Sequence, residues 1–328
     1  MAFYTMKKGT LVFNPNSGKG KAKERAQDFA GAWKREFGND LTLRPTKSLA
    51  DIRVAAVETV KDPDNVPIFM GGDGTLSESV QGLAEHFDFK PLDRPVGLLP
   101  GGTGNSFLRD FLITDYETAR DSLISALRSK SVQNSDLAVI KYQGLKMDRE
   151  EQPGATVRRI TFNIFGVGLI ADITELAVQM RWMGAANYTV ASLWKLLFHK
   201  PYSFEITIDG KRTDVSCNMI TIHNSQYTGG SMHIAPAVRV NDGQLFYLVP
   251  MFRSRPTLFK KFPTIFKGSH LDSEEILTGF VKNIGIRHAA PVWMNVDGEL
   301  ERGWNPDLSI QPNFWKIYLS QERLLASH

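Results

Sequence analysis

Residues 71–75 read Gly-Gly-Asp-Gly-Thr and follow directly on the apolar run Val-Pro-Ile-Phe-Met at 66–70. A short apolar run that ends in glycines is typical of a buried strand leaving a parallel sheet. Glycine allows positive φ angles and lets the main chain approach a ligand closely. A single carboxylate among three glycines therefore predicts a loop that cradles phosphate where a strand gives way to a helix.

The first 130 residues alternate short β-rich runs with helical patterns. The β-rich runs lie at 10–14, 42–45, 66–70 and 96–100, and helices are expected from about Lys21, Leu49 and Leu76. This alternation predicts βαβ units and an open, mostly parallel sheet. Residues 1–130 are thus expected to form one α/β domain.

The composition changes after about Ser131. Runs of Val, Ile, Thr and Phe are broken by Asp-Gly turns at 209–210, 242–243 and 297–298, which predicts mainly antiparallel β-structure. Helical patterns interrupt these runs at about 170–198 and 256–281. The second domain is therefore predicted to span 131–312, with the segment 313–328 packing back on the first domain.

Three glycine-rich turns each follow a predicted strand of the first domain, at residues 14–18, 71–75 and 100–105. The carboxyl ends of parallel strands meet at one edge of a sheet, and the helices that follow direct N–H groups toward anions there. One such turn is explained equally well as a tight connection. All three together favour a phosphate-binding site.

Two common nucleotide motifs are absent. A Walker A loop needs a glycine at Phe13 and a hydroxyl residue after Lys19, and the third glycine of G-x-G-x-x-G is replaced by Lys23 in one run and by Ser77 in the other. What remains is a phosphate cradle that contains Asp73. Because Mg²⁺ prefers one or two carboxylates with phosphate oxygens and waters, the cradle predicts bound Mg²⁺.

The composition excludes several other classes. A lone cysteine, Cys217, forms no internal disulfide, and the seven histidines show no metal-finger spacing. No segment has about 18 uninterrupted apolar residues, and the start lacks a signal-peptide pattern, so a cytoplasmic protein that does not cross a membrane is predicted. A net charge of +4 permits contact with anionic lipid or nucleotide.

These motifs, taken in order, resemble the catalytic domain of diacylglycerol, sphingosine and ceramide kinases. The matching segments are G-G-D-G-T at 71–75, L-L-P-G-G-T-G-N-S-F-L-R-D at 98–110, N-P-N-S-G at 14–18 and D-G-E at 297–299. G-G-D-G alone is shared with NAD kinases and phosphofructokinases. The resemblance implies an N-terminal α/β domain like that of NAD kinases and phosphofructokinases, and a C-terminal domain that is a mainly antiparallel β-sandwich.

The resemblance also implies the site residues of an ATP- and Mg²⁺-dependent kinase. Asp73 and Glu299 compete for the role of base, with Asp297 beside Glu299. A metal site is implied at the Asp242 carboxylate with backbone oxygens near Arg239 and Gln244. The implied ATP contacts are Asn14, Pro15, Asn16, Ser17, Gly18, Thr46, Gly72, Gly74, Thr75, Glu78, Gly102, Thr103 and Asn105.

The acceptor is expected to be a lipid bound by the second domain. Residues 166–198 carry apolar stripes at helical spacing, which core packing alone would explain; in sphingosine kinases, similar helices enclose the lipid tail. The residues implied to contact lipid are Asp172, Thr174, Leu176 and Trp194. Sphingosine kinases have a second acid where Thr174 stands, so a neutral acceptor is predicted, diacylglycerol first and a ceramide-like lipid second. The loop 103–110 is also closer to the diacylglycerol kinase form, although Ser106 stands where those enzymes usually have an acid.

Residues 252–267 mix five basic residues with four phenylalanines, which predicts peripheral attachment to an anionic membrane. No RNA-binding motif accompanies this stretch, so no nucleic-acid partner is expected. A homodimer is left open. The alternatives are a sphingosine kinase, a soluble NAD kinase, and a non-catalytic lipid- or nucleotide-binding protein.

Overall fold

The computed structural model describes residues 8–102, 104–145, 153–180, 187–261, 264 and 267–326. The chain forms two compact units, one of residues 1–137 with 312–328 and the other of residues 138–311. The boundaries predicted from the sequence were 130/131 and 312/313. The two units are joined within β5 (Val132–Leu145) and β17 (Glu299–Tyr318), which each cross a boundary.

Unit 1 is built on a parallel sheet with the strand order β2-β1-β3-β4. The end of β17 adds a further parallel strand, because Lys316 pairs with Pro95 and Ile317 with Val96. Chain 312–328 therefore belongs to this unit. The strands are β1 (Lys8–Phe13), β2 (Thr42–Pro45), β3 (Asn65–Gly71) and β4 (Pro95–Pro100).

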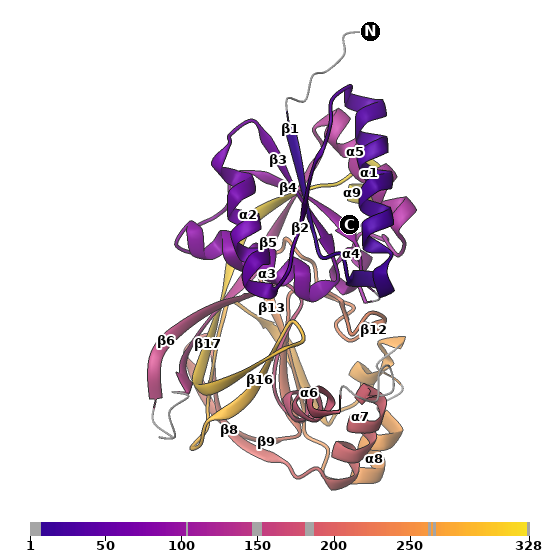
Figure 1. Cartoon of the computed structure of the whole chain (residues 1–328). Coiled ribbons are helices and arrows are strands. Elements are labelled where there is room, and N and C mark those ends of the chain that lie inside the picture. Colours follow the sequence, from indigo (N-terminus) through magenta and orange to yellow (C-terminus); the bar gives the residue numbers. More distant parts are fainter. Residues whose placement is uncertain are drawn as a thin grey trace. The chain divides into compact units, whose positions relative to one another are not determined.

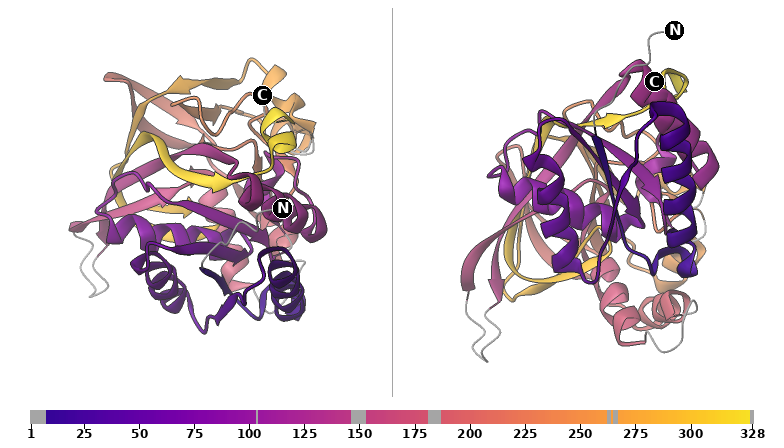
Figure 2. Two further views of the ribbon diagram at one scale, coloured as in Figure 1. Left: turned by 90° about the horizontal axis from the view of Figure 1, so that it is seen from above. Right: turned by 45° about the horizontal axis from the view of Figure 1, so that its top comes forward.

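Helices cover both faces of this sheet (Figure 1). α2 packs on α3, and α1 packs on α5 on the opposite side, as two views show (Figure 2). Apolar residues at helical spacing bury one side of α1, including Phe29 and Trp33. The helices are α1 (Ala22–Phe37), α2 (Leu49–Lys61), α3 (Asp73–His86), α4 (Ser106–Arg109), α5 (Tyr116–Ser129) and α9 (Gln321–Ala326), with a 3₁₀ turn at Ser17–Gly20.

The second unit is mainly antiparallel, which confirms the predicted fold class. The order β14-β13-β10-β7-β16-β17 forms one run, while β15 pairs with β17 and β8, β8 with β9, and β5 with β17 and β6. The strands are β6 (Pro153–Thr161), β7 (Ile164–Gly168), β8 (Tyr202–Ile208), β9 (Lys211–Cys217), β10 (Met219–His223), β11 (Tyr227–Thr228), β12 (Met232–His233), β13 (Leu245–Pro250), β14 (Ile276–Val281), β15 (Asn283–Arg287) and β16 (Val292–Val296).

One apolar core joins both groups of strands in unit 2. Phe165 and Ile220 of the long run share this core with Ile206 of β8 and Ile284 of β15. A second apolar cluster, of Leu169, Leu196, Phe252 and Leu258, packs together α6 (Leu169–Gln179), α7 (Asn187–Phe198) and α8 (Arg255–Lys261). A 3₁₀ turn at Ser269–Asp272 follows.

Two of the expected helix limits are wrong. The helix expected at 256–281 ends at Lys261, and residues 276–281 form β14, which pairs antiparallel with β13. The Ile-Leu-Thr-Gly-Phe-Val sequence of β14 suits a strand once β13 offers an edge. The helix expected from Leu76 begins three residues earlier at Asp73, since the N–H groups of Thr75 and Leu76 both donate to the Gly72 carbonyl.

The loops after β1, β3 and β4 meet main chain to main chain. The Gly101 N–H donates to the Gly71 carbonyl at 2.7 Å. A methyl group on Gly102 would lie 2.5 Å from the Gly72 Cα, and one on Gly18 would clash with the Gly101 carbonyl. Of these glycines, Gly18 alone has a positive φ, of 61°. Close approach, rather than positive φ, is therefore what the other glycines provide.

Gly102→Ala is expected to destabilise unit 1 by about 1–3 kcal/mol, because its methyl group meets backbone that cannot rotate away. Gly31→Ala is the matched control: Gly31 lies inside α1, and its methyl group meets only the flexible Arg35 guanidinium. That change should stabilise by up to about 1 kcal/mol. Urea unfolding measures both, and equal effects would contradict the packing described.

Candidate functional site

The first loop, residues 14–18, is a tight turn held by its own side chain. The Asn14 Oδ1 accepts from the Asn16 N–H at 3.0 Å, and the Ser17 N–H donates to the Asn14 carbonyl at 3.0 Å. Gly18 follows at the start of the 3₁₀ turn and lies against the third loop. β1 and β3 are neighbours whose helices leave to opposite faces, so loops 14–18 and 71–75 lie where the strand order reverses. Ligands bind at such points in open α/β sheets.

Asp73 connects the second loop to the third. Its Oδ1 accepts from the Ser106 N–H at 2.8 Å, and its Oδ2 accepts from the Ser106 hydroxyl at 3.0 Å. Asp73 opens α3, where the helix dipole favours a negative charge, and Ser106 opens α4. The carboxylate therefore ties the start of α3 to the start of α4. Sequence reasoning did not identify Ser106 as its partner, although it marked Ser106 as a departure from the family pattern.

Four further residues implied to contact ATP lie beside these loops. The Thr46 hydroxyl donates to the Phe13 carbonyl at 3.2 Å, and Thr75 is buried in the first turn of α3. Glu78 is buried and forms an ion pair with Arg53 of α2. The remaining residue, Asn105, is described next, while Thr103 lies outside the described residues.

Asn105 leaves an acceptor atom open at the third loop. Its Nδ2 donates to the Gly102 carbonyl at 3.0 Å, but its buried Oδ1 has no hydrogen-bond partner among the residues that the structure describes. A buried acceptor without a donor costs free energy, so such an atom in a native fold points to a missing donor. The Asn105 Oδ1 can thus accept a hydrogen bond from a ligand bound at these loops.

Asp242 lies between β12 and β13 and is half-buried. Its Oδ1 accepts from the Gln244 N–H at 2.9 Å. Burial raises the pKa of Asp242, and amide N–H groups that include those of Gln244 and Arg239 oppose this increase. This carboxylate is hydrogen-bonded by N–H groups rather than placed among the carbonyl oxygens of the implied metal site, and metal binding here stays a prediction.

The two acids of the D-G-E motif have different surroundings. Asp297 and Gly298 both have positive φ, which forms a tight hairpin turn between β16 and β17. The Asp297 carboxylate is buried and accepts from the Thr161 hydroxyl at 2.7 Å and from the N–H groups of residues 162–164 at 2.9–3.1 Å. The position of Asp297 therefore points to holding the turn rather than to direct contact with substrate. Glu299 is partly exposed at the first position of β17.

The residues implied to bind lipid differ in exposure. Asp172 accepts from the Tyr202 hydroxyl at 2.8 Å, and burial raises its pKa. Thr174 is 2% exposed, donates to the Ile170 carbonyl and accepts from the Asn295 amide. The other two differ as well, since Leu176 is partly buried and Trp194 is 58% exposed. Thr174 thus satisfies its hydrogen bonds inside unit 2, and Asn295 is a partner that the sequence did not reveal.

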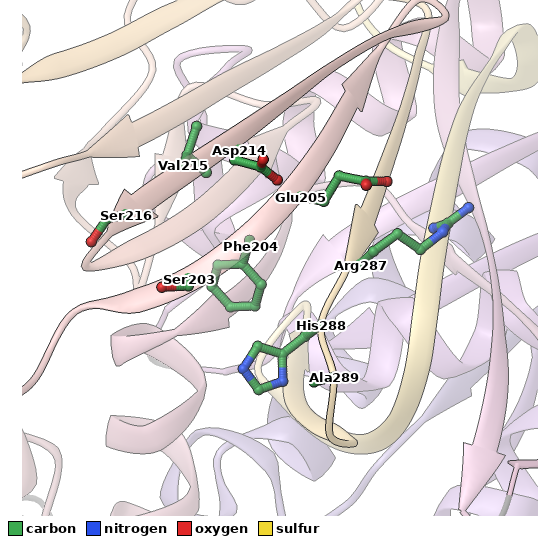
Figure 3. A pocket seen from close by; sticks show the side chains of 9 residues that line it. All are labelled: Ser203, Phe204, Glu205, Asp214, Val215, Ser216, Arg287, His288 and Ala289. Carbon is green, nitrogen blue, oxygen red and sulfur yellow. The ribbon is translucent and has the colours of Figure 1, made fainter.

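A shallow hollow of about 550 Å³ lies elsewhere in unit 2, over β8, β9 and the end of β15 (Figure 3). None of the residues implied to bind ATP, metal or lipid lines it. Among the described residues, no group of three or more His, Cys, Asp or Glu side chains is placed to hold a metal ion. The hollow is lined by Ser203, Phe204, Glu205, Asp214, Val215, Ser216, Arg287, His288 and Ala289.

Asp297→Ala is expected to destabilise unit 2 by at least about 2 kcal/mol, because several buried donors lose their acceptor. Glu299→Ala, two residues away, should change stability by no more than about 0.5 kcal/mol. Urea unfolding of the two variants measures the difference. A mild effect at Asp297 would contradict its role in holding the turn.

The same residue predicts a pH dependence. Burial raises the pKa of Asp297 to about 6, above the value of about 4 in an unfolded chain. The folded state therefore binds the proton more tightly, so this group's contribution to stability is present at low pH and is lost as pH rises through about 6. As the pH falls from 7 to 5, the free energy of unfolding of the wild type should rise relative to that of Asp297→Asn. A fall over the same pH range would contradict the raised pKa of Asp297.

Comparison with known proteins relates both units to kinases. Residues 8–140 match the diacylglycerol kinase catalytic domain, and residues 163–319 match the YegS C-terminal NAD kinase beta sandwich-like domain. Together, the two matches span most of the chain and follow the two units of the structure.

Relatives of known name extend over most of the chain. A diacylglycerol kinase of Mycobacterium tuberculosis (strain H37Rv) is 27% identical over 282 residues, which is 85% of this chain and 84% of that protein. A diacylglycerol kinase of Bacillus subtilis (strain 168) is 26% identical over 303 residues, 90% of each chain. The crystal structure of a diacylglycerol kinase from Bacillus anthracis str. Sterne has the same fold, with a TM-score of 0.66 at 17% identity over 96% of this chain and 97% of that one. The chain therefore belongs to the lipid kinase family that shares the diacylglycerol kinase catalytic domain, and it is a kinase.

Proposed function

We propose that this kinase transfers the γ-phosphoryl group of ATP to a hydroxyl of a neutral membrane lipid, with diacylglycerol first and a ceramide-like lipid second. The observation that carries the proposal is the contact of three glycine-rich loops around Asp73, in the unit that matches the diacylglycerol kinase catalytic domain. The names of the relatives from Mycobacterium tuberculosis and Bacillus subtilis support the choice of diacylglycerol.

Main-chain groups are proposed to bind the phosphates. The loops at 14–18, 71–75 and 100–105 carry no bulky side chain at their mutual contacts, so phosphate oxygens can approach their N–H groups. Phosphoryl transfer passes through a loose transition state, in which positioning and charge neutralisation supply most of the catalysis. The site therefore requires well-placed donors more than a strong base.

The residues present fit Mg²⁺ that is bound together with the phosphates of ATP, rather than Mg²⁺ in a site made of protein ligands alone. The described part of the chain has no cluster of three or more acids or histidines for an all-protein cage, whereas Mg²⁺ beside ATP uses one or two carboxylates with phosphate oxygens and waters. Asp73 is proposed to hold it, because its Oδ1 accepts only the Ser106 N–H and keeps a lone pair, whereas Oδ2 accepts from both the Ser106 N–H and hydroxyl. When bound, Mg²⁺ would neutralise charge on the phosphates. The Asn105 Oδ1 is an acceptor for a donor of the nucleotide complex.

Asp73 and Glu299 are the two candidates for the base that takes the proton from the lipid hydroxyl. Asp73 is held in one orientation by Ser106, while the Glu299 carboxylate is partly exposed and makes no hydrogen bond or ion pair within the described part of the chain. We propose that Asp73 serves the nucleotide and that Glu299 serves the acceptor. Asp297 supports Glu299 by holding the turn that precedes it.

The preference for a neutral lipid follows from charge. A cationic amine would need a carboxylate, and Asp172 is already hydrogen-bonded to Tyr202 with a raised pKa. Two residues further along α6, Thr174 offers no charge. Burial of an ammonium group without a paired anion costs several kcal/mol, which disfavours sphingosine as the acceptor.

Peripheral membrane association in the cytoplasm is part of the proposal. No helix among the described residues is long and apolar enough to cross a membrane. A lipid with two acyl chains resides in a bilayer, so its kinase is expected to work at the bilayer surface. The homodimer stays a prediction.

The test of the proposed function is phosphorylation of a lipid panel with labelled ATP in matched mixed micelles. We expect kcat/KM to be highest for diacylglycerol, lower for ceramide and at least about tenfold lower for sphingosine, because one unpaired charge is worth more than 1.4 kcal/mol. NAD in solution serves as the control for the NAD kinase alternative. A clear preference for sphingosine or NAD would refute the proposal.

Asp73→Asn and Glu299→Gln should separate the two roles. Asp73→Asn is expected to lower kcat by about 100-fold or more while the protein remains folded. Glu299→Gln should lower kcat while ATP affinity changes little. Isothermal titration with ATP and steady-state kinetics measure both variants. If Glu299→Gln loses ATP binding and keeps its kcat, the assigned role is wrong.

A further inference from the structure

α7 has one buried and one exposed apolar face. On the buried face, Leu196 joins the cluster with Leu169, Phe252 and Leu258. The exposed face, at positions i, i+1, i+4 and i+5, has side chains that are 49–58% exposed, and the rings of its two aromatic residues lie 4.9 Å apart. Contiguous apolar faces of this kind mark interaction sites in folded proteins. The face consists of Leu193, Trp194, Leu197 and Phe198.

The chain around this face is strongly cationic. The stretches 187–204 and 251–271 contain no Asp or Glu. α8 packs against α7 through the same apolar cluster and belongs to the second stretch, as Figure 1 also shows. Lys195 forms an ion pair with Glu175, whereas Lys200, Arg253 and Lys260 are exposed. The seven basic residues are Lys195, Lys200, Arg253, Arg255, Lys260, Lys261 and Lys267.

The docking expected from the sequence at 252–267 needs a correction. Phe252 and Leu258 are buried in the core of this region, and Phe259 packs against the same cluster. Phe262, Pro263, Ile265 and Phe266 lie outside the described residues. The described residues of 252–267 thus contribute charge, and the exposed apolar side chains beside α8 are those on α7.

We propose that the exposed face of α7 inserts into the headgroup boundary of an anionic bilayer, with Lys200, Arg253 and Lys260 on the anionic headgroups. Trp and Leu side chains favour this depth, and each basic residue near an anionic surface adds attraction. A second copy of the chain is a poor occupant, because its own cationic rim would repel this one. The inference rests on the proposed function only in taking the substrate from a bilayer.

The first test measures partition onto phosphatidylcholine vesicles with and without phosphatidylglycerol. The triple variant Leu193→Gln, Leu197→Gln and Phe198→Gln should bind anionic vesicles at least about tenfold more weakly, because it removes apolar area from the contact. The matched control is Leu49→Gln with Val54→Gln on α2, where both side chains are also half-exposed. Both variants should keep the unfolding temperature and ATP affinity of the wild type.

The second test locates the contact. Tryptophan emission should shift to the blue when anionic vesicles are added to the wild type, and Trp194→Phe should bind equally well with little shift. Lys200→Glu with Lys260→Glu should weaken binding to anionic vesicles, and salt should weaken binding of the wild type. The proposal is overturned if the wild type does not bind vesicles, which is the result expected if the face binds a protein instead. It is also overturned if the triple variant binds vesicles as tightly as the wild type does.

These outcomes are separate from the kinase activity itself. A short-chain diacylglycerol dispersed below its micellar concentration tests the proposed function without a membrane. Loss of vesicle binding in the triple variant, with phosphorylation of this dispersed lipid by the wild type, supports both. If the wild type phosphorylates the dispersed lipid but the triple variant binds vesicles as the wild type does, only the proposed docking face is overturned.

Discussion

Direct contact between the main chains of three glycine-rich loops is the constraint on which the catalytic unit depends. Parallel pairing of β1, β3 and β4 brings their ends to one edge, but side chains at 18, 101 or 102 would force the loops apart. Their absence leaves N–H groups at the surface of the contact and allows Asp73 to reach Ser106. The same packing thus serves both the fold and the proposed phosphate site.

Asp297 and Glu299 belong to one short motif but differ in burial, and this difference separates a structural role from a chemical one. Burial raises the pKa of Asp297 although four hydrogen-bond donors oppose the rise, whereas Glu299 is partly exposed at the end of the same turn. Glu78 is neutralised by Arg53 within unit 1. Charge that is buried with partners stabilises a geometry, and charge that remains accessible is left for chemistry.

The sequence predicts the fold class, the glycine loops and the lipid kinase family, because these depend on local periodicity and on turn residues. The hairpin turns at Asp209-Gly210 and Asp297-Gly298 are confirmed for the same reason, with positive φ at all four residues. Long-range partners could not be predicted. The bonds of Asp73 to Ser106 and of Thr174 to Asn295 join segments 33 and 121 residues apart. β14 was mistaken for helix because its strand character depends on the edge of β13.

Amide hydrogen exchange with a non-hydrolysable ATP analogue and Mg²⁺ tests most directly whether the three loops form one phosphate site. Protection should increase together in residues 14–18, 71–75 and 100–105, because their N–H groups would bind the phosphates. The β8–β9 hairpin of unit 2 serves as the internal reference and should not change. Protection in one loop alone, or none in any of the three, would contradict the account.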